Sequence, residues 1–142
     1  MSTALSVHAV HQGAMCVLAK NGTHEVVMDY PLQAGEKCAG FTPLQMLLAS
    51  LAACSLNSLM VVLKRRMNQP VTGIEVDVRA LRAEQHPTVL TEIALDFEVK
   101  GIGVTADAVA TALRISEEQL CPVWNMLKGG TPITATFRIV ES

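Results

Sequence analysis

Residues 40–54 read GFTPLQMLLASLAAC, and this stretch decides the fold because it opens a long apolar helix. Thr42 is a good N-cap, Pro43 suits the first helical position, and Gln45 completes a capping box with Thr42. The helical pattern continues to about Met67, just before a proline-containing segment that stops it. About 25 residues at roughly 1.5 Å each make a helix of about 38 Å, which is long enough to cross a small domain.

This predicted helix is apolar over most of its circumference, so we expect it to be surrounded on several sides. Its length also fits a membrane span, and Lys64-Arg65-Arg66 follow it directly. We favour a buried central helix, because the flanking segments are amphipathic strands that need a helix to cover them. Polar side chains also interrupt the apolar run, at Gln45, Ser50, Ser55, Asn57 and Ser58.

Alternating strand patterns lie on both sides of the helix in the sequence. Three runs precede it, at residues 5–9, 14–20 and 23–30. Asn21-Gly22 between the last two is a strong hairpin signal. Three more runs follow the helix, at residues 74–80, 93–99 and 133–139. Each apolar sheet face must pack on another element, and the long helix is the obvious one.

A second helical region lies between the last two strand patterns. Thr105 is expected to cap a short helix, and Ser116 with Gln119 resembles a second capping box. Pro122 is incompatible with the interior of a continuing helix. We therefore expect a break, with Cys121 near a new helix start and Pro122 at its first position.

The composition points to one α+β domain over residues 1–142. Half of the residues are hydrophobic, which is ample for a core, and only 4% are aromatic. A mean hydropathy of +0.34 is high for a small domain, so part of the apolar surface is expected to lie against a second subunit. The net charge of −2 and the lack of a long basic run argue against nucleic-acid binding.

The four cysteines follow neither zinc-site spacing nor a Cys-x-x-Cys pattern. They are Cys16, Cys38, Cys54 and Cys121. The first residues lack a basic region followed by an apolar run, so we expect a cytoplasmic protein. In that compartment a bond between two cysteines is more often catalytic than structural. We expect no metal and no cofactor, because the histidines are scattered, at positions His8, His11, His24 and His86.

Two cysteines have contexts that favour reactivity. Cys54 lies in the long helix, with Ser50, Asn57 and Ser58 three or four residues away, so one flank is polar. Cys121 at a helix start would have its thiolate stabilised by backbone N–H groups and by the helix dipole. For each cysteine the alternative is a thiol that only packs in the core.

Two segments together resemble the OsmC/Ohr family. They are residues 40–54 and the stretch SEEQLCPV at residues 116–123. The strand order around these helices matches as well. The resemblance implies an α+β fold with a long central helix wrapped by antiparallel β-sheet in an intertwined homodimer. It also places the active sites at the subunit interface.

The catalytic branches of that family are thiol peroxidases that prefer organic hydroperoxides. Carried over, Cys54 attacks the peroxide and becomes a sulfenic acid, and Cys121 resolves it as a disulfide. An unknown dithiol reductant then restores both thiols.

The sequence departs from the catalytic pattern of the family at two positions. Active members pair the thiolate with an arginine from the N-terminal half and with a glutamate just after the helix-starting proline. Here no arginine precedes Arg65, and Leu44 follows Pro43. Candidate activating groups are Gln45, Glu36 and Lys37.

Three functions therefore remain open. The first is a peroxidase whose apolar pocket accepts a bulky peroxide, with lining candidates Met46, Leu47, Leu51, Trp124 and Met126. The second is a non-catalytic protein of the same fold that binds a small apolar ligand at the dimer interface. The third is a structural or stress-associated protein without small-molecule chemistry. The distance between Cys54 and Cys121 separates the first from the third.

Overall fold

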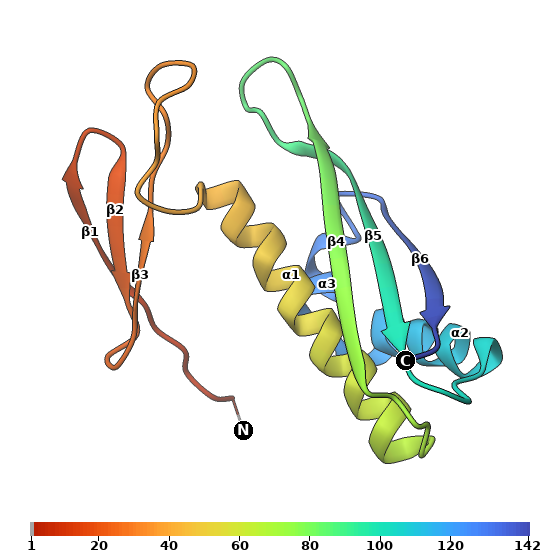
Figure 1. Ribbon diagram of the computed structural model, residues 1–142. Helices are drawn as coiled ribbons and strands as arrows, with labels where there is room; N and C mark the ends of the chain where they lie inside the picture. Colours follow the sequence, from red (N-terminus) through yellow and green to blue (C-terminus); the bar gives the residue numbers. More distant parts are fainter. Residues whose placement is uncertain (1) are drawn as a thin grey trace. The chain divides into compact units, whose positions relative to one another are not determined.

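The computed structural model describes residues 2–142, and the chain divides into two compact units. The first unit extends to Leu48, and the second comprises Ala49–Ser142. Each unit contains its own three-stranded sheet (Figure 1). The expected α+β class is confirmed, and the expectation of a single domain stays a prediction.

The first unit contains strands β1 (His8–Gly13), β2 (Cys16–Lys20) and β3 (Glu25–Met28), paired antiparallel in that order. The predicted hairpin at Asn21-Gly22 is confirmed, because its loop joins β2 to β3. The side-chain oxygen of Asn21 accepts hydrogen bonds from the backbone N–H groups of residues 23 and 24. The first strand begins later than predicted, since the ladder with β2 starts only at His8.

The long helix comprises α1 (Pro43–Met60) and a π-helical continuation, η1 (Val61–Arg66). The predicted capping box is confirmed at its start. The N–H of Gln45 donates to the Thr42 hydroxyl at 3.2 Å, and the N–H of Thr42 donates to the Gln45 side-chain oxygen at 3.0 Å. At its other end, the helix stops at Arg66, within a residue of the predicted end near Met67.

The long helix is less buried than the sequence suggested. By length and composition it could span a membrane, and 28% of its most apolar window is buried within the chain. Its buried residues repeat every three to four positions, as in an amphipathic core helix: Leu51, Ser55, Leu59, Val62 and Leu63. The expectation that the helix is surrounded on several sides is not met within one chain, because its buried residues lie along one side.

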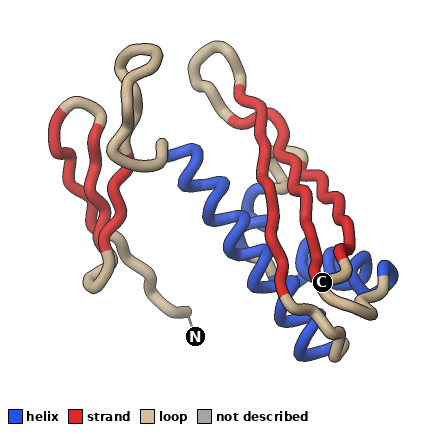
Figure 2. The backbone as a smooth tube through the Cα atoms, viewed as in Figure 1, coloured by secondary structure: helices blue, strands red, loops and turns tan. Residues whose placement is uncertain are grey.

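The second unit is built on strands β4 (Gly73–Arg82), β5 (Leu90–Lys100) and β6 (Ile133–Val140), shown as red tubes in Figure 2. β4 and β5 are antiparallel, whereas β5 and β6 are parallel, so this sheet is mixed. A parallel neighbour needs a crossover. That crossover consists of α2 (Ala106–Ile115), η2 (Ser116–Leu120) and α3 (Pro122–Leu127).

The two faces of this sheet differ as the alternation predicted. On the inner face of β5 the side chains are buried, namely Ile93, Leu95, Phe97 and Val99. The outer face has cross-strand ion pairs, including Arg79–Asp96 at 2.6 Å and Lys100–Glu75 at 3.7 Å. Such exposed pairs contribute little to stability, so the core of this unit depends on the buried face.

The start of the second helical region agrees with the prediction, but its middle does not. Thr105 caps α2, its hydroxyl accepting from the N–H of Ala108 at 3.2 Å. The predicted second capping box at Ser116 is wrong. Ser116 has helical backbone angles and continues α2 directly into the π-helical turn η2, so no new helix begins there. Its hydroxyl is buried and has no hydrogen-bond partner among the described residues.

Candidate active site

Cys54 lies in the middle of α1 and is half-buried. The predicted polar flank is present around it. The Ser58 hydroxyl donates to the Cys54 carbonyl at 2.9 Å, and the buried Ser55 hydroxyl donates to the Leu51 carbonyl at 2.8 Å. These serines satisfy their hydroxyl groups within the helix, so a polar side chain is tolerated beside the core.

Cys121 is the N-cap of α3, as the position of Pro122 predicted. Its backbone is extended, with φ −76° and ψ 106°, as expected for a residue that precedes proline. The N–H of Trp124 donates to the Cys121 sulfur at 3.5 Å, as a capping interaction does. The Cys121 side chain is fully buried. The backbone geometry before Pro122 and the capping interaction therefore hold this thiol inside the core.

The structure brings Cys54 and Cys121 together. Both thiols are free, and the Cys54 side chain lies close enough to that of Cys121 to raise its pKa. Both residues belong to the second compact unit. Two thiols that interact in this way are placed for disulfide formation after oxidation of one member.

Burial, together with the interaction with the Cys54 side chain, raises the pKa of the Cys121 thiol from its ordinary 9.0 to about 11. The N–H groups of Trp124 and Val123 act in the opposite direction, but more weakly. The expected stabilisation of a Cys121 thiolate by N–H groups at the helix start is therefore present, but burial outweighs it. Loss of water around the sulfur outweighs the stabilisation that a single helical turn offers.

Asn125 fixes the chain on both sides of Cys121. Its side-chain amide donates to the Glu117 carbonyl at 2.9 Å and to the Cys121 carbonyl at 2.8 Å. Asn125 was not among the candidate residues expected from the sequence. The available signal was an amide side chain three residues after Pro122, at a point where a helical backbone loses an N–H donor.

The predicted activating groups all lie in the first unit. Gln45 is used by the capping box described above. The Glu36 carboxylate accepts from the N–H groups of Leu32 and Gln33 at 3.0 and 3.2 Å, so it orders its own loop. Lys37 is exposed in the same loop. The structure thus gives two of these residues a local structural role, and an activating role for any of them stays a prediction.

The predicted pocket residues have different environments. Leu51 and Trp124 are fully buried in the core of the second unit, whereas Met126 is 74% exposed. Met46 and Leu47 are half-buried in the part of α1 that belongs to the first unit. The indole N–H of Trp124 has no hydrogen-bond partner among the described residues. A lining role for these five residues stays a prediction.

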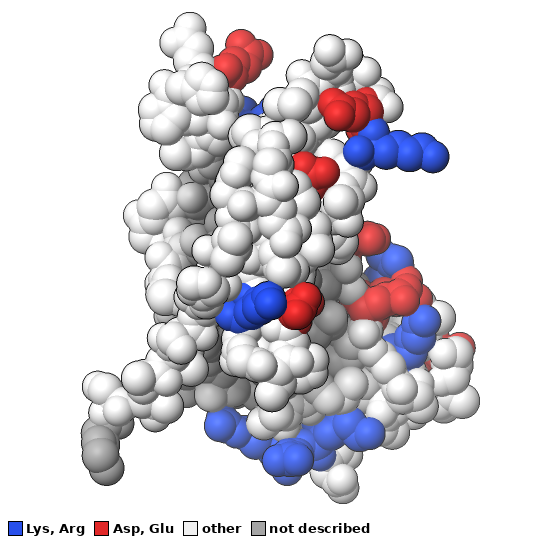
Figure 3. Space-filling view, turned by 90° about the vertical axis from the view of Figure 1, so that its left-hand side faces the viewer, with Lys and Arg blue, Asp and Glu red and all other residues white. Residues whose placement is uncertain are grey.

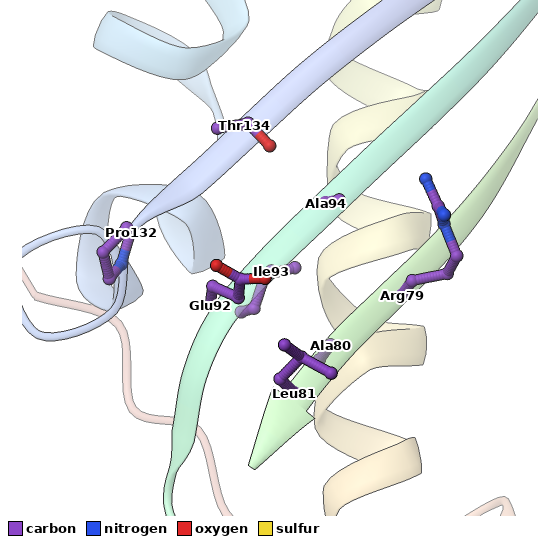
Figure 4. A pocket seen from close by; sticks show the side chains of 8 residues that line it. All are labelled: Arg79, Ala80, Leu81, Glu92, Ile93, Ala94, Pro132 and Thr134. Carbon is purple, nitrogen blue, oxygen red and sulfur yellow. The ribbon is translucent and has the colours of Figure 1, made fainter. Parts of the chain in front are cut away.

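A surface pocket of about 430 Å³ lies on the sheet of the second unit and contains none of the predicted site residues. Figure 4 shows Arg79 and Leu81 on β4, Glu92 and Ala94 on β5, and Thr134 on β6 around it. Arg79 is already paired with Asp96. The pocket is open and no cysteine lines it, so we base the candidate site on the thiol pair.

The remaining cysteines and the histidines do not extend the site. Cys16 is half-buried on β2 and Cys38 is exposed. Within residues 2–142, no three His, Cys, Asp or Glu side chains are grouped as metal ligands would be.

Comparisons of the sequence and of the structure both find similar proteins. Residues 34–136 match the sequence model of the family described as OsmC-like protein. Protein YhfA of Escherichia coli K12 is 32% identical over 119 residues, which cover 84% of this chain and 85% of YhfA. A hypothetical protein from Aquifex aeolicus VF5 has a similar structure, with a TM-score of 0.87, 23% identity and coverage of 99% of both chains. An organic hydroperoxide resistance protein of Legionella pneumophila has a TM-score of 0.73 and 16% identity, covering 95% of this chain and 96% of its own.

Proposed function

The chain belongs to the OsmC-like protein family, and on this premise we propose that it is a thiol peroxidase that reduces organic hydroperoxides. The observation that supports this proposal is the interaction between the thiols of Cys54 and Cys121. The Legionella relative named for organic hydroperoxide resistance has the same fold and supports the choice of substrate class.

In the proposed reaction the Cys54 thiolate attacks one peroxide oxygen. The O–O bond breaks, an S–O bond forms, and the departing alkoxide takes a proton to leave as an alcohol. Cys54 is then a sulfenic acid. The Cys121 sulfur attacks the Cys54 sulfur, the S–O bond breaks, and the hydroxide leaves as water with the proton of Cys121. An external dithiol reduces the disulfide by exchange and closes the cycle.

The different environments of the two thiols support this division of roles. Cys54 is partly accessible, as a group that meets substrate must be. Cys121 is fully buried, and its raised pKa keeps it protonated near neutral pH. A protonated, enclosed thiol reacts poorly with peroxide in solution but stands next to the sulfenic acid when that forms. We therefore assign the first step to Cys54 and the second to Cys121.

We also propose that the protein is a homodimer in the cytoplasm. The first unit exposes large apolar side chains that a lone chain would leave in water, among them Leu5, Val7, Val10, Met15 and Val26. Figure 3 shows few charged side chains on the face that the N-terminal sheet presents. The uncovered part of the long helix adds further apolar surface. A second copy of the chain would bury both surfaces.

A second function is favoured by two features of the sequence. No arginine precedes Arg65, and Leu44 follows Pro43, so the groups expected to activate the thiolate in active members are missing. A non-catalytic protein that binds a small apolar ligand would need neither group. It would be stabilised by that ligand and would not turn over peroxide.

The test is turnover of cumene hydroperoxide with dithiothreitol as the reductant. The wild-type protein should consume peroxide, and Cys54→Ser should not. Cys38→Ser is the matched control, because it removes an exposed thiol of the first unit and should leave the rate unchanged. Equal rates for Cys54→Ser and the wild-type protein would contradict the proposal. Absence of turnover in the wild-type protein, with a thermal shift on adding an apolar ligand, would favour the binding function.

A further inference from the structure

The turn from Ser116 to Cys121 ends before a proline, which removes one backbone donor. The N–H of Cys121 donates to the Ser116 carbonyl at 2.9 Å, which is the i to i+5 bond of a π-helical turn. The same pattern would pair the Glu117 carbonyl with the N–H of residue 122. That residue is proline, which has no N–H. The Glu117 carbonyl is therefore left without a backbone partner.

Asn125 supplies the missing donor. Its side-chain nitrogen donates to the Glu117 carbonyl at 2.9 Å and, with its other hydrogen, to the Cys121 carbonyl at 2.8 Å. The Cys121 carbonyl also accepts from the backbone N–H of Asn125 at 3.1 Å. One half-buried side chain thus ties the last turn before Cys121 to the first turn after Pro122.

We propose that Asn125 is a positioning residue that holds Cys121 against Cys54. This inference rests on the proposed function for its chemical meaning. The Cys121 peptide lies between two helical segments that differ in backbone geometry, and α3 is short. Without the two amide bonds, the Glu117 carbonyl would lose its donor and the Cys121 carbonyl would keep only the backbone N–H of Asn125, so the Cys121 backbone would shift. A displacement of about 1 Å can cost a reaction roughly a hundredfold in rate.

A positioning role affects the two steps of the cycle differently. Oxidation of Cys54 by peroxide does not need Cys121, so it should be insensitive to Asn125. Formation of the Cys54–Cys121 disulfide needs both sulfurs in contact, so it should depend on Asn125. A residue that merely supports the fold would slow both steps together.

The experiment compares the wild-type protein with Asn125→Ala and Asn125→Asp. Aspartate keeps the size of the side chain but cannot donate when ionised. The matched control is Gln119→Ala, which removes an exposed amide from the neighbouring turn. The rate of Cys54 oxidation is measured with cumene hydroperoxide in a Cys121→Ser background by trapping the sulfenic acid. The rate of disulfide formation is measured separately in proteins that keep both cysteines.

Diamide gives a second measurement of disulfide formation that does not depend on peroxide. One thiolate adds to its N=N bond, and the other thiol displaces the hydrazine, so two thiols become a disulfide and diamide is reduced. Circular dichroism is used to check that each variant is folded.

We expect both Asn125 variants to form the disulfide about tenfold more slowly or worse, with Cys54 oxidation unchanged and Gln119→Ala like the wild-type protein. Disulfide formation at the wild-type rate in folded Asn125→Ala and Asn125→Asp would overturn the inference. So would an equal slowing of both steps. A wild-type protein inert to peroxide, whose diamide reaction still depends on Asn125, would reject the proposed function and leave the positioning role supported.

Discussion

The side chain of Cys54, in the middle of α1, interacts with the thiol of Cys121, the N-cap of α3. The two residues are far apart in the sequence but meet within one compact unit. One thiol is partly accessible and the other is fully buried. This contact sets the chemistry that the site can perform and also gives the folded protein a characteristic dependence on pH.

The first prediction concerns stability at alkaline pH. The pKa of Cys121 is raised from 9.0 to about 11, so between these values the folded state keeps a proton that the unfolded state has lost. The stabilisation is fully present below pH 9.0 and is lost as the pH rises towards about 11. Urea unfolding of the reduced protein across this range should show a falling free energy of unfolding.

Cys121→Ala should remove that part of the decline, whereas Cys16→Ala is the control and should keep it. The two variants differ only in which cysteine is lost, so the comparison isolates Cys121. An identical decline in Cys121→Ala and the wild-type protein would show that Cys121 titrates normally.

The second prediction concerns the capping box at the start of the long helix. Thr42→Ala leaves the N–H of Gln45 without its acceptor and should lower the free energy of unfolding by about 1 kcal/mol. Gln45→Glu keeps an acceptor for the Thr42 N–H and should be tolerated. Urea denaturation of both variants measures the effect. A larger loss in Gln45→Glu than in Thr42→Ala would contradict the capping role.

The third prediction concerns the core of the second unit. Phe97 on β5 is fully buried, so Phe97→Ala should destabilise the protein by about 3–5 kcal/mol through lost burial and a cavity. Ile102→Ala is a suitable control because Ile102 is 71% exposed, and its effect should stay within about 0.5 kcal/mol. Chemical denaturation measures the free energy of unfolding of both variants. If both substitutions lowered it by similarly small amounts, Phe97 would not belong to the core.

The fourth prediction concerns assembly. Analytical ultracentrifugation should give a mass twice the 15.2 kDa of the chain. Val10→Lys places a charge on an exposed apolar position of the first unit and should weaken the association. A wild-type protein that sediments as a monomer at micromolar concentration would contradict the dimer proposal.

Features that depend on local sequence were predictable. The capping box at Thr42 and Gln45, the hairpin at Asn21-Gly22 and the helix start at Pro122 each follow from nearby residues, and the structure confirms them. Alternation along residues 93–99 likewise identified the buried face of β5.

Features that depend on long-range contacts were not predictable from the pattern. Ser116 fits a capping box by sequence, but in the structure the helix continues from α2 through Ser116 as a π-helical turn. The Cys121 pKa depends on burial, which local sequence does not report. Asn125 was missed because its role requires knowing that the Glu117 carbonyl lacks a backbone donor. The parallel pairing of β6 with β5 also required the path of the crossover.

The proposed reaction of Cys54 and Cys121 is tested most directly by a single-turnover reaction followed by mapping of the products. Reduced protein is mixed with one equivalent of cumene hydroperoxide, quenched by alkylation of free thiols, digested and analysed by mass spectrometry. We expect rapid appearance of a Cys54–Cys121 disulfide, with Cys16 and Cys38 alkylated. Persistent free thiols at Cys54 and Cys121 would contradict the proposed reaction.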